Sequence, residues 1–167
     1  FVTLAISAFV IITALKGVRQ VPQGSKWVVQ RLGKFNSSLN PGLNFIIPYI
    51  DIVAYKITTK DIVLDIPSQE VITKDNAVLI TNAVAYINII SPEKAVYGVE
   101  DYVIAIQTLV QTSLRSIVGE MTLDDALSSR EHIKAKLKGA ISDDIADWGI
   151  TLKTVEIQDV NPSPTMQ

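Results

Sequence analysis

The first fifteen residues, FVTLAISAFVIITAL, carry no charge, no proline and no glycine. A helix that crosses the hydrocarbon core of a bilayer needs about 20 mainly apolar residues. Because the chain begins without a methionine, we interpret residues 1–16 as the end of a longer transmembrane helix. The alternatives are a signal-peptide core, which no small-residue cleavage pattern supports, and a buried core helix.

The charges that follow this apolar segment are all positive until residue 51. Five basic residues precede the first acidic one, Asp51, in the order Lys16, Arg19, Lys26, Arg31 and Lys34. Positively charged residues accumulate on the cytoplasmic side of a membrane helix. The pattern therefore predicts a single-pass protein whose soluble domain lies in the cytoplasm.

The composition excludes several classes of function. A chain of 167 residues suffices for one domain of ordinary size or for two small ones. Its net charge of −2 lacks the basic excess that nucleic-acid binding requires. We therefore expect no nucleic-acid partner. The chain has no cysteine and a single histidine, so we expect no metal site, and we also expect no other cofactor.

The hydrophobic pattern indicates an α+β fold. Over residues 17–90, short segments alternate apolar and polar side chains between turn residues, which is typical of antiparallel strands. Over residues 91–160 the period lengthens to that of helices, and a last strand closes the chain at 150–160. We predict a β-rich subdomain over the first range and a helix-rich subdomain over the second.

Three features of the second subdomain predict local structure. Asp101 and Thr122 are placed to begin helices, the second of them a long amphipathic stretch that ends near Trp148. One apolar stripe runs along this stretch, formed by Ile133, Leu137, Ile141, Ile145 and Trp148. In the closing strand the apolar phase shifts between Leu152 and Val155, which suggests a β-bulge.

No residue pattern marks an active site. His132 has no second histidine or cysteine with which to share a metal, and Ser113 lies outside any G-x-S-x-G motif. No glycine-rich phosphate loop occurs. We therefore predict no catalytic, cofactor-binding or metal-binding residue, and no enzyme. A membrane-bound hydrolase of the Ser-Lys type and a small lipid-binding regulatory module are the alternative hypotheses.

Six blocks of sequence resemble one family of membrane proteins. The chain is similar to the stomatin, prohibitin, flotillin and HflK/HflC family, whose shared unit is the SPFH or band-7 domain, and within it to slipin-like bacterial members of the QmcA type. The blocks are VPQGSKWVVQRLGKF (21–35), LNPGLNFIIPYID (39–51), LDIPSQEVITKDN (64–76), YGVED (97–101), QTSLRSIVGEMTLDDALSSRE (111–131) and WGITLKTVEIQDV (148–160).

The resemblance implies a membrane-anchored scaffold of the bacterial inner membrane that assembles with copies of itself into a large ring or cage. Such an assembly would enclose a patch of bilayer and organise a membrane microdomain. The resemblance also implies a coiled-coil helix after the domain, of which residues 161–167 would be the start. The implied partners are the chain itself, the lipid bilayer, and an AAA-type membrane protease or an NfeD-like membrane protein.

Two groups of residues fit this interpretation. The apolar segment around residues 41–49 suits insertion at the bilayer surface, and the predicted membrane-contact residues are Leu43, Phe45, Ile46, Ile47 and Tyr49. The long helix carries charges of both signs, which suit contact between different faces of neighbouring copies. The predicted interface residues are Glu131, Lys134, Lys138, Asp143, Asp144 and Asp147.

Overall fold

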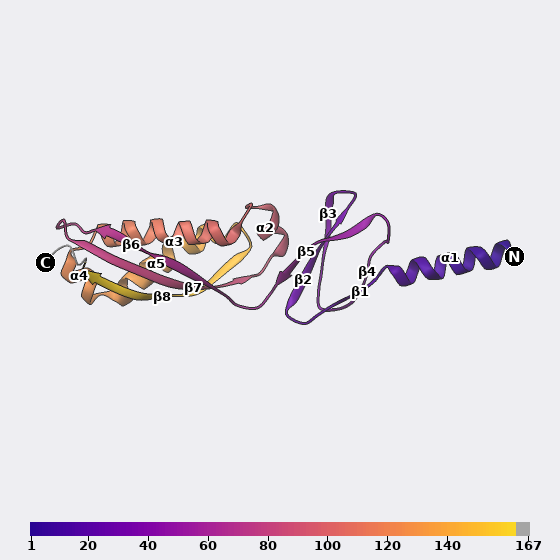
Figure 1. Ribbon diagram of the computed structural model, residues 1–167, viewed down its shortest axis with the longest axis horizontal. Helices are drawn as coiled ribbons and strands as arrows, with labels where there is room; N and C mark the ends of the chain where they lie inside the picture. Colours follow the sequence, from indigo (N-terminus) through magenta and orange to yellow (C-terminus); the bar gives the residue numbers. More distant parts are fainter. Residues whose placement is uncertain (163–167) are drawn as a thin grey trace. The chain divides into compact units, whose positions relative to one another are not determined.

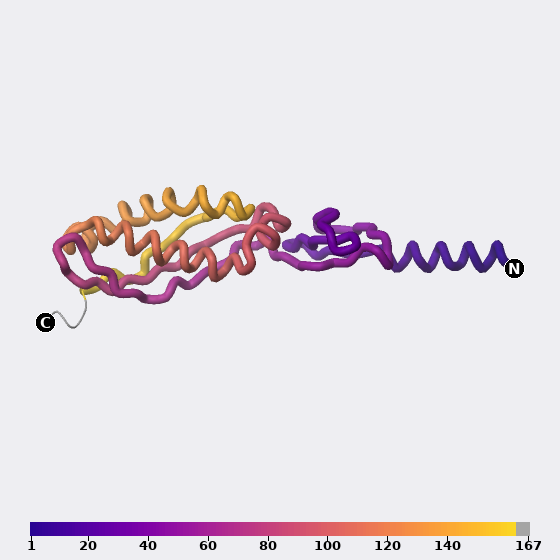
Figure 2. Tube along the Cα trace, turned by 90° about the horizontal axis from the view of Figure 1, so that it is seen from above, coloured from indigo at the N-terminus to yellow at the C-terminus, as the bar shows by residue number. Residues whose placement is uncertain are grey.

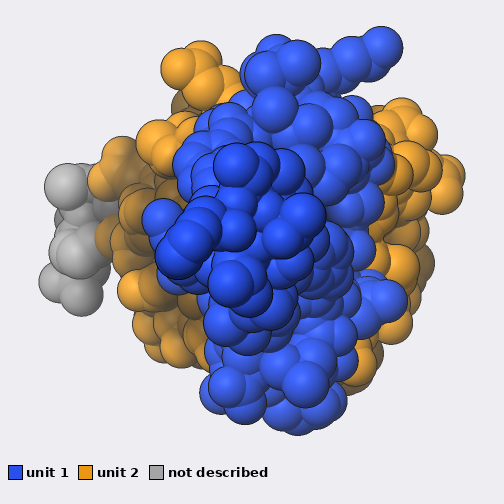
Figure 3. Space-filling model, turned by 90° about the vertical axis from the view of Figure 1, so that its right-hand side faces the viewer, with its two compact units in different colours: residues 1–60 blue, residues 61–167 orange. Residues whose placement is uncertain are grey.

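The computed structural model describes residues 1–162, and the chain divides into two compact units. Unit 1 is Phe1–Lys60 and unit 2 begins at Asp61, as the colours of Figure 3 show. The observed boundary differs from the predicted one after residue 90. The reason is that residues 62–89 form two strands that pair with each other and with the closing strand of the chain.

Unit 1 contains one helix and two small antiparallel β-structures (Figure 1). Helix α1 (Val2–Lys16) is followed after a single residue by β1 (Val18–Val21), which pairs with β4 (Gly42–Phe45). The second structure is a sheet of order β3-β2-β5, with β2 at Ser25–Arg31, β3 at Lys34–Leu39 and β5 at Asp51–Thr58. A small apolar core holds the unit together, formed by Val21, Val29, Leu39 and Ile46 with Trp27 and Val53 packed against it.

Helix α1 buries none of its residues against the rest of the chain. Its large apolar side chains are more than half exposed, from Ile12 at 54% to Val2 and Leu4 at 72%. Over residues 1–162, no helix combines the length and the apolar character that crossing a membrane requires.

Unit 2 is a three-stranded antiparallel sheet with helices on one face. The strands are β6 (Ile62–Ile72), β7 (Val78–Ile89) and β8 (Ile150–Pro162), in the order β6-β7-β8. The helices are α2 (Pro92–Tyr97), α3 (Tyr102–Gly119), α4 (Leu123–Ser128) and α5 (Arg130–Ala146). The two long ones, α3 and α5, run side by side, with α3 on β6 and α5 on β8 (Figure 2).

The strand register explains why the helices cover only one face of this sheet. Leu64, Ala85 and Val155 form one cross-strand row and are all buried. The next row, which points to the opposite face, ends in the exposed residues Asp65 and Glu156. Alternation of this kind along all three strands gives the α+β architecture that the sequence predicted.

Several local predictions for unit 2 are confirmed. Asp101 is the N-cap of α3, and its carboxylate accepts hydrogen bonds from the amides of Val103 and Ile104. Four members of the predicted apolar stripe are completely buried, namely Ile133, Leu137, Ile141 and Ile145. The predicted bulge is also present, because Tyr86 pairs with Thr154 while Ile87 pairs with Leu152, which leaves Lys153 as an extra residue.

The predicted single helix from Thr122 to Trp148 is wrong. It breaks at Ser129, whose φ of −115° and ψ of 45° are not helical, so that α4 and α5 are separate helices. Ser129 is both the C-cap of α4 and the N-cap of α5, since its amide donates to the Asp125 carbonyl at 2.9 Å and its carbonyl accepts from the Ile133 amide at 3.1 Å.

The end of the chain also differs from the prediction of a coiled-coil start at residues 161–167. Asn161 and Pro162 lie in β8 because they pair with Ile80 and Leu79. The remainder of that prediction, residues 163–167, falls outside the described residues.

We expect Leu137→Ala to destabilise unit 2 by about 2–5 kcal/mol, since it removes a fully buried side chain and leaves a cavity between α5 and β8. Urea unfolding followed by circular dichroism measures the change. The matched control is Lys136→Ala, an exposed neighbour on the same helix, which should change stability by less than about 0.5 kcal/mol. Equal effects of the two substitutions would contradict the packing described here.

Candidate membrane-contact site

The loop between β4 and β5, residues 46–50, lies against the carboxyl end of α1. The Ile46 amide donates to the Gly17 carbonyl at 2.8 Å, and Val18 pairs with Phe45. A Cβ at position 17 would lie 2.2 Å from the Ile46 carbonyl oxygen, so only glycine permits this approach. The loop and the helix are thus joined directly, without a flexible linker.

An apolar groove runs between this loop and α1. Its lining comes from two turns of the helix and from the loop, and consists of Phe9, Val10, Thr13, Ala14, Phe45, Ile47 and Pro48. The helical residues of the groove precede Gly17 by three to eight positions. At 1.5 Å per residue, the groove therefore extends from about 4 to about 12 Å along the helix from its carboxyl end.

Four of the five predicted membrane-contact residues are exposed. The exposed fractions are 79% for Leu43, 62% for Phe45, 43% for Ile47 and 72% for Tyr49. Two of them, Phe45 and Ile47, line the groove beside α1, and exposed apolar patches of this kind are typical of interaction surfaces. We call these four residues, together with α1, the apolar surface of unit 1.

The structure corrects the prediction for the fifth residue, Ile46. It is only 4% exposed and packs in the core with Val21, Val29 and Leu39. The reason is the alternation of the extended chain, which turns Phe45 and Ile47 outward and Ile46 inward. Ile46 therefore cannot contact a membrane without unfolding unit 1.

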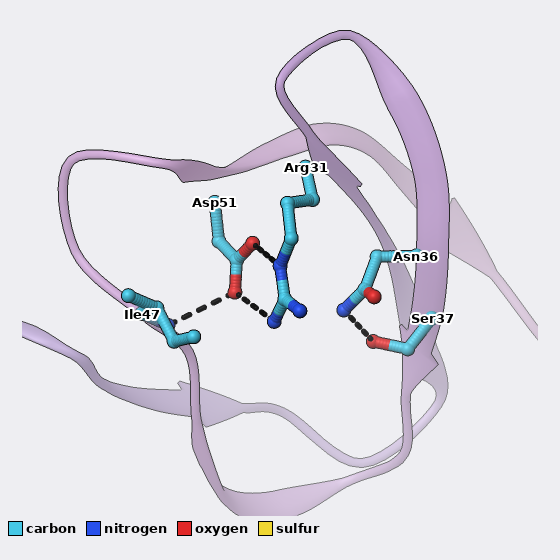
Figure 4. Close-up of polar contacts among 5 residues, drawn as sticks. All are labelled: Arg31, Asn36, Ser37, Ile47 and Asp51. Atoms are coloured by element: carbon cyan, nitrogen blue, oxygen red, sulfur yellow. Dashed lines mark hydrogen bonds and ion pairs between the residues drawn. The ribbon is translucent and has the colours of Figure 1, made fainter.

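A salt bridge between Arg31 and Asp51 holds the loop in this conformation (Figure 4). Arg31 Nε donates to Asp51 Oδ1 at 2.8 Å and Nη2 donates to Oδ2 at 3.2 Å. The Ile47 amide donates to the same Oδ2 at 2.9 Å, and the Asp51 amide donates back to the Ile47 carbonyl at 2.9 Å. The Asp51 side chain, 2% exposed, thus joins a strand end to the apolar loop.

These hydrogen bonds stabilise the charged forms of both side chains. The hydrogen bonds from Arg31, and then that from the Ile47 amide, hold the pKa of Asp51 below its usual value. The hydrogen bond with Asp51 raises the pKa of Arg31. Sequence reasoning missed this pair, although Asp51 stands out as the one acidic residue among the first 60.

The predicted interface residues lie on α5 and just after it, and five of the six are exposed: Glu131, Lys138, Asp143, Asp144 and Asp147. Lys134 is different because its Nζ pairs with Glu156 Oε1 of β8 at 2.8 Å. This contact raises the pKa of Lys134 and lowers that of Glu156. Lys134 therefore binds its own sheet in this structure.

The residues considered for chemistry do not come together. His132 is an exposed residue of α5, and Ser113 is a half-buried residue of α3. Within residues 1–162, no three side chains of the metal-binding types lie close enough to hold an ion.

Comparison with known proteins now identifies the family. The SPFH domain / Band 7 family matches residues 19–167. This chain belongs to that family. The predicted resemblance to the SPFH or band-7 family is thereby confirmed, and membership supports a membrane-associated scaffold.

Three relatives show how similar the chain is to known proteins and how much of their length it covers. An uncharacterized protein of Methanocaldococcus jannaschii is 43% identical over 157 residues, which is 94% of this chain and 77% of the relative. An uncharacterized protein of Mycobacterium tuberculosis is 35% identical over 159 residues, 95% of this chain and 42% of the relative. Human stomatin-like protein 2, mitochondrial, is 40% identical over 147 residues, which is 88% of this chain and 41% of the relative. The chain thus spans about two fifths of the last two.

We expect the Ile47 amide to lose protection from hydrogen exchange when the Asp51 carboxylate is neutralised. The stabilisation is complete above the ordinary aspartate pKa of about 3.9 and is lost as the pH falls through the lower pKa of folded Asp51. In Asp51→Asn, protection should already be low at neutral pH. Exchange measured by mass spectrometry tests this, with Asp65→Asn as an exposed control; wild-type protection in Asp51→Asn would refute the role of the pair.

Proposed function

We propose that this SPFH chain is the membrane-proximal part of a non-enzymatic scaffold that assembles with copies of itself into a large ring or cage. Attachment to the bilayer is through the apolar surface of unit 1. The observation that carries this proposal is the direct joining of an uncovered apolar helix to an exposed apolar loop, through Gly17 and Ile46.

The geometry supports entry of the loop together with the helix. The groove reaches about 4 to 12 Å along α1, and the hydrocarbon of one leaflet is about 15 Å thick. If α1 enters the bilayer up to Gly17, then Phe45 and Ile47 enter its outer part. Burial of each large apolar side chain contributes about 1.5–3 kcal/mol, and Tyr49 suits the interface between hydrocarbon and headgroups.

The polar end of α1 supports the same depth. Arg19 Nη1 donates at 2.7 Å to the carbonyl of Lys16, the last residue of α1, and at 3.2 Å to that of Val18, so a carbonyl at the helix end is satisfied where the hydrocarbon would end. We propose that α1 is the cytoplasmic end of a helix that spans a bacterial inner membrane once, with the rest of the chain in the cytoplasm. The basic residues after α1 support this orientation.

We expect a fluorophore at Ile47→Cys to be quenched by brominated lipids when the chain is held in a nanodisc. The chain has no other cysteine, so labelling is specific. Adding Phe45→Asp should lower the quenched fraction about tenfold or more, since a charge replaces a ring that the proposed attachment buries in the bilayer. The control label is at Lys60→Cys, beyond the opposite end of β5. Unquenched label at position 47 would overturn the proposed loop insertion.

The charge distribution on α5 supports self-assembly. Basic residues fall within its first nine positions, at Arg130, Lys134, Lys136 and Lys138, whereas Asp143, Asp144 and Asp147 follow at its carboxyl end. At the carboxyl end this is unfavourable, because a helix macrodipole disfavours acidic residues in the last turn by about 0.3–1 kcal/mol per charge and no basic residue lies there; the first turn holds both Arg130 and Glu131. The acidic end of α5 is therefore unfavourable within one copy and becomes favourable when it meets the basic residues of a neighbour's α5.

We expect Asp143→Lys with Asp144→Lys to reduce the size of the assembly while leaving the fold stable, because the change agrees with the macrodipole. Adding Lys136→Asp and Lys138→Asp should restore the size, since the two halves are again complementary. Mass photometry of gently extracted protein measures both. A particle of one size in all variants would refute the role of α5, and a wild-type monomer or dimer would refute the assembly.

The remaining parts of the proposal rest on the resemblance alone. They are the organisation of a membrane microdomain, the QmcA-type affiliation, a coiled coil after the domain, and regulation of an AAA-type membrane protease or an NfeD-like membrane protein.

A further inference from the structure

The hairpin between β2 and β3 ends in an unusual turn. Leu32 and Gly33 both have positive φ, at 53° and 85°, and together form a two-residue turn. Such turns favour asparagine followed by glycine, because bulky side chains are strained in the left-handed region. Leu32 is also 80% exposed, so its side chain gains no burial in return. A leucine at this position is therefore unfavourable for the isolated fold.

This hairpin tip is hydrogen-bonded to the loop of residues 46–50. The Leu32 amide donates to the Ile50 carbonyl at 3.1 Å, and the preceding residue, Arg31, binds Asp51. The tip and the apolar loop consequently lie at the same end of the β2-β5 pair. Any surface that the loop enters is also presented to the tip.

A hollow beside the tip combines apolar and basic groups. It is lined by Arg31, Leu32, Lys34, Phe35 and Asn36. Two of the guanidinium nitrogens of Arg31 bind Asp51, and the third points toward the Asn36 side chain (Figure 4). Within the described residues no ion pair neutralises Lys34. The hollow thus offers N–H donors and a free positive charge next to an exposed leucine.

The charge of each unit indicates the partner. Unit 1 contains seven basic residues and one acidic residue, and that acidic residue is paired with Arg31. Unit 2 contains eight basic and sixteen acidic residues. An anionic bilayer attracts unit 1 and repels unit 2, and the attraction acts on residues within about one Debye length of the surface.

We propose that the hairpin tip, residues 31–36, docks on the headgroups of anionic phospholipids, with Leu32 between them and with Lys34 and Arg31 binding a lipid phosphate. The inference rests on the proposed membrane attachment of unit 1. It adds a second contact, formed by residues outside the predicted membrane-contact set, and a preference for lipid charge.

The test uses the full chain in nanodiscs with an environment-sensitive fluorophore at Asn36→Cys, on the rim of the hollow. In discs of phosphatidylcholine with about one third phosphatidylglycerol, the emission should shift to shorter wavelength, and in pure phosphatidylcholine it should resemble that in water. Lys34→Gln should lower the ratio of docked to free tip about fivefold. The matched control, Lys60→Gln, removes the same charge beyond the other end of β5 and should leave the ratio unchanged.

Leu32→Asn gives a second, independent variant. It introduces the residue that the turn favours, so unit 1 should unfold at higher urea while docking decreases. A decrease in docking with a gain in stability cannot come from misfolding.

The outcomes separate this inference from the attachment itself. A water-like signal at position 36 in anionic discs, with quenched label at Ile47→Cys, overturns the docking inference alone. Equal shifts in neutral and anionic discs overturn the charge preference. Water-like signals at both positions overturn the inference and the proposed attachment together.

Discussion

The salt bridge between Arg31 and Asp51 determines the conformation of the whole apolar edge of unit 1. Its carboxylate accepts hydrogen bonds from a strand side chain and from the backbone of the loop, so β2, β5 and the loop are held by one group. The apolar core of the unit is small. An ion pair with one buried partner is weak evidence for stability, but it favours one arrangement, because a loop conformation that breaks it leaves the buried Asp51 carboxylate unpaired.

That arrangement exposes two kinds of surface on unit 1, one apolar and one basic. The loop carries apolar side chains outward while Ile46 enters the core, and the neighbouring hairpin carries an exposed leucine beside basic residues. Unit 2 has a different character, with helices on one face of its sheet, an excess of acidic residues and a long helix, α5, whose last turn is acidic and holds no basic residue. The proposed attachment and the proposed assembly therefore depend on different units of the chain.

Much of the fold follows from periodicity and caps, whereas the site depends on contacts distant in sequence. The stripe on α5, the N-cap at Asp101 and the bulge in β8 depend on local patterns, and each is observed. The sequence misplaces the unit boundary because β8 pairs with β7 across the whole helical segment, which no local pattern reveals. Ile46 is assigned wrongly although the alternation of an extended chain is sufficient to separate it from Phe45 and Ile47. The pairing of Arg31 with Asp51, twenty residues apart, requires the structure.

The single residue between α1 and β1 has a mechanical meaning. Gly17 alone separates α1 from β1, and its carbonyl accepts a hydrogen bond from the loop at Ile46. The helix, the β1-β4 pair and the loop are therefore expected to rotate together. The tilt of a membrane helix changes with the thickness of the bilayer. In the proposed attachment, a thicker or thinner membrane would rotate unit 1 about the bilayer surface, which makes the orientation of the soluble strands a readout of local lipid composition.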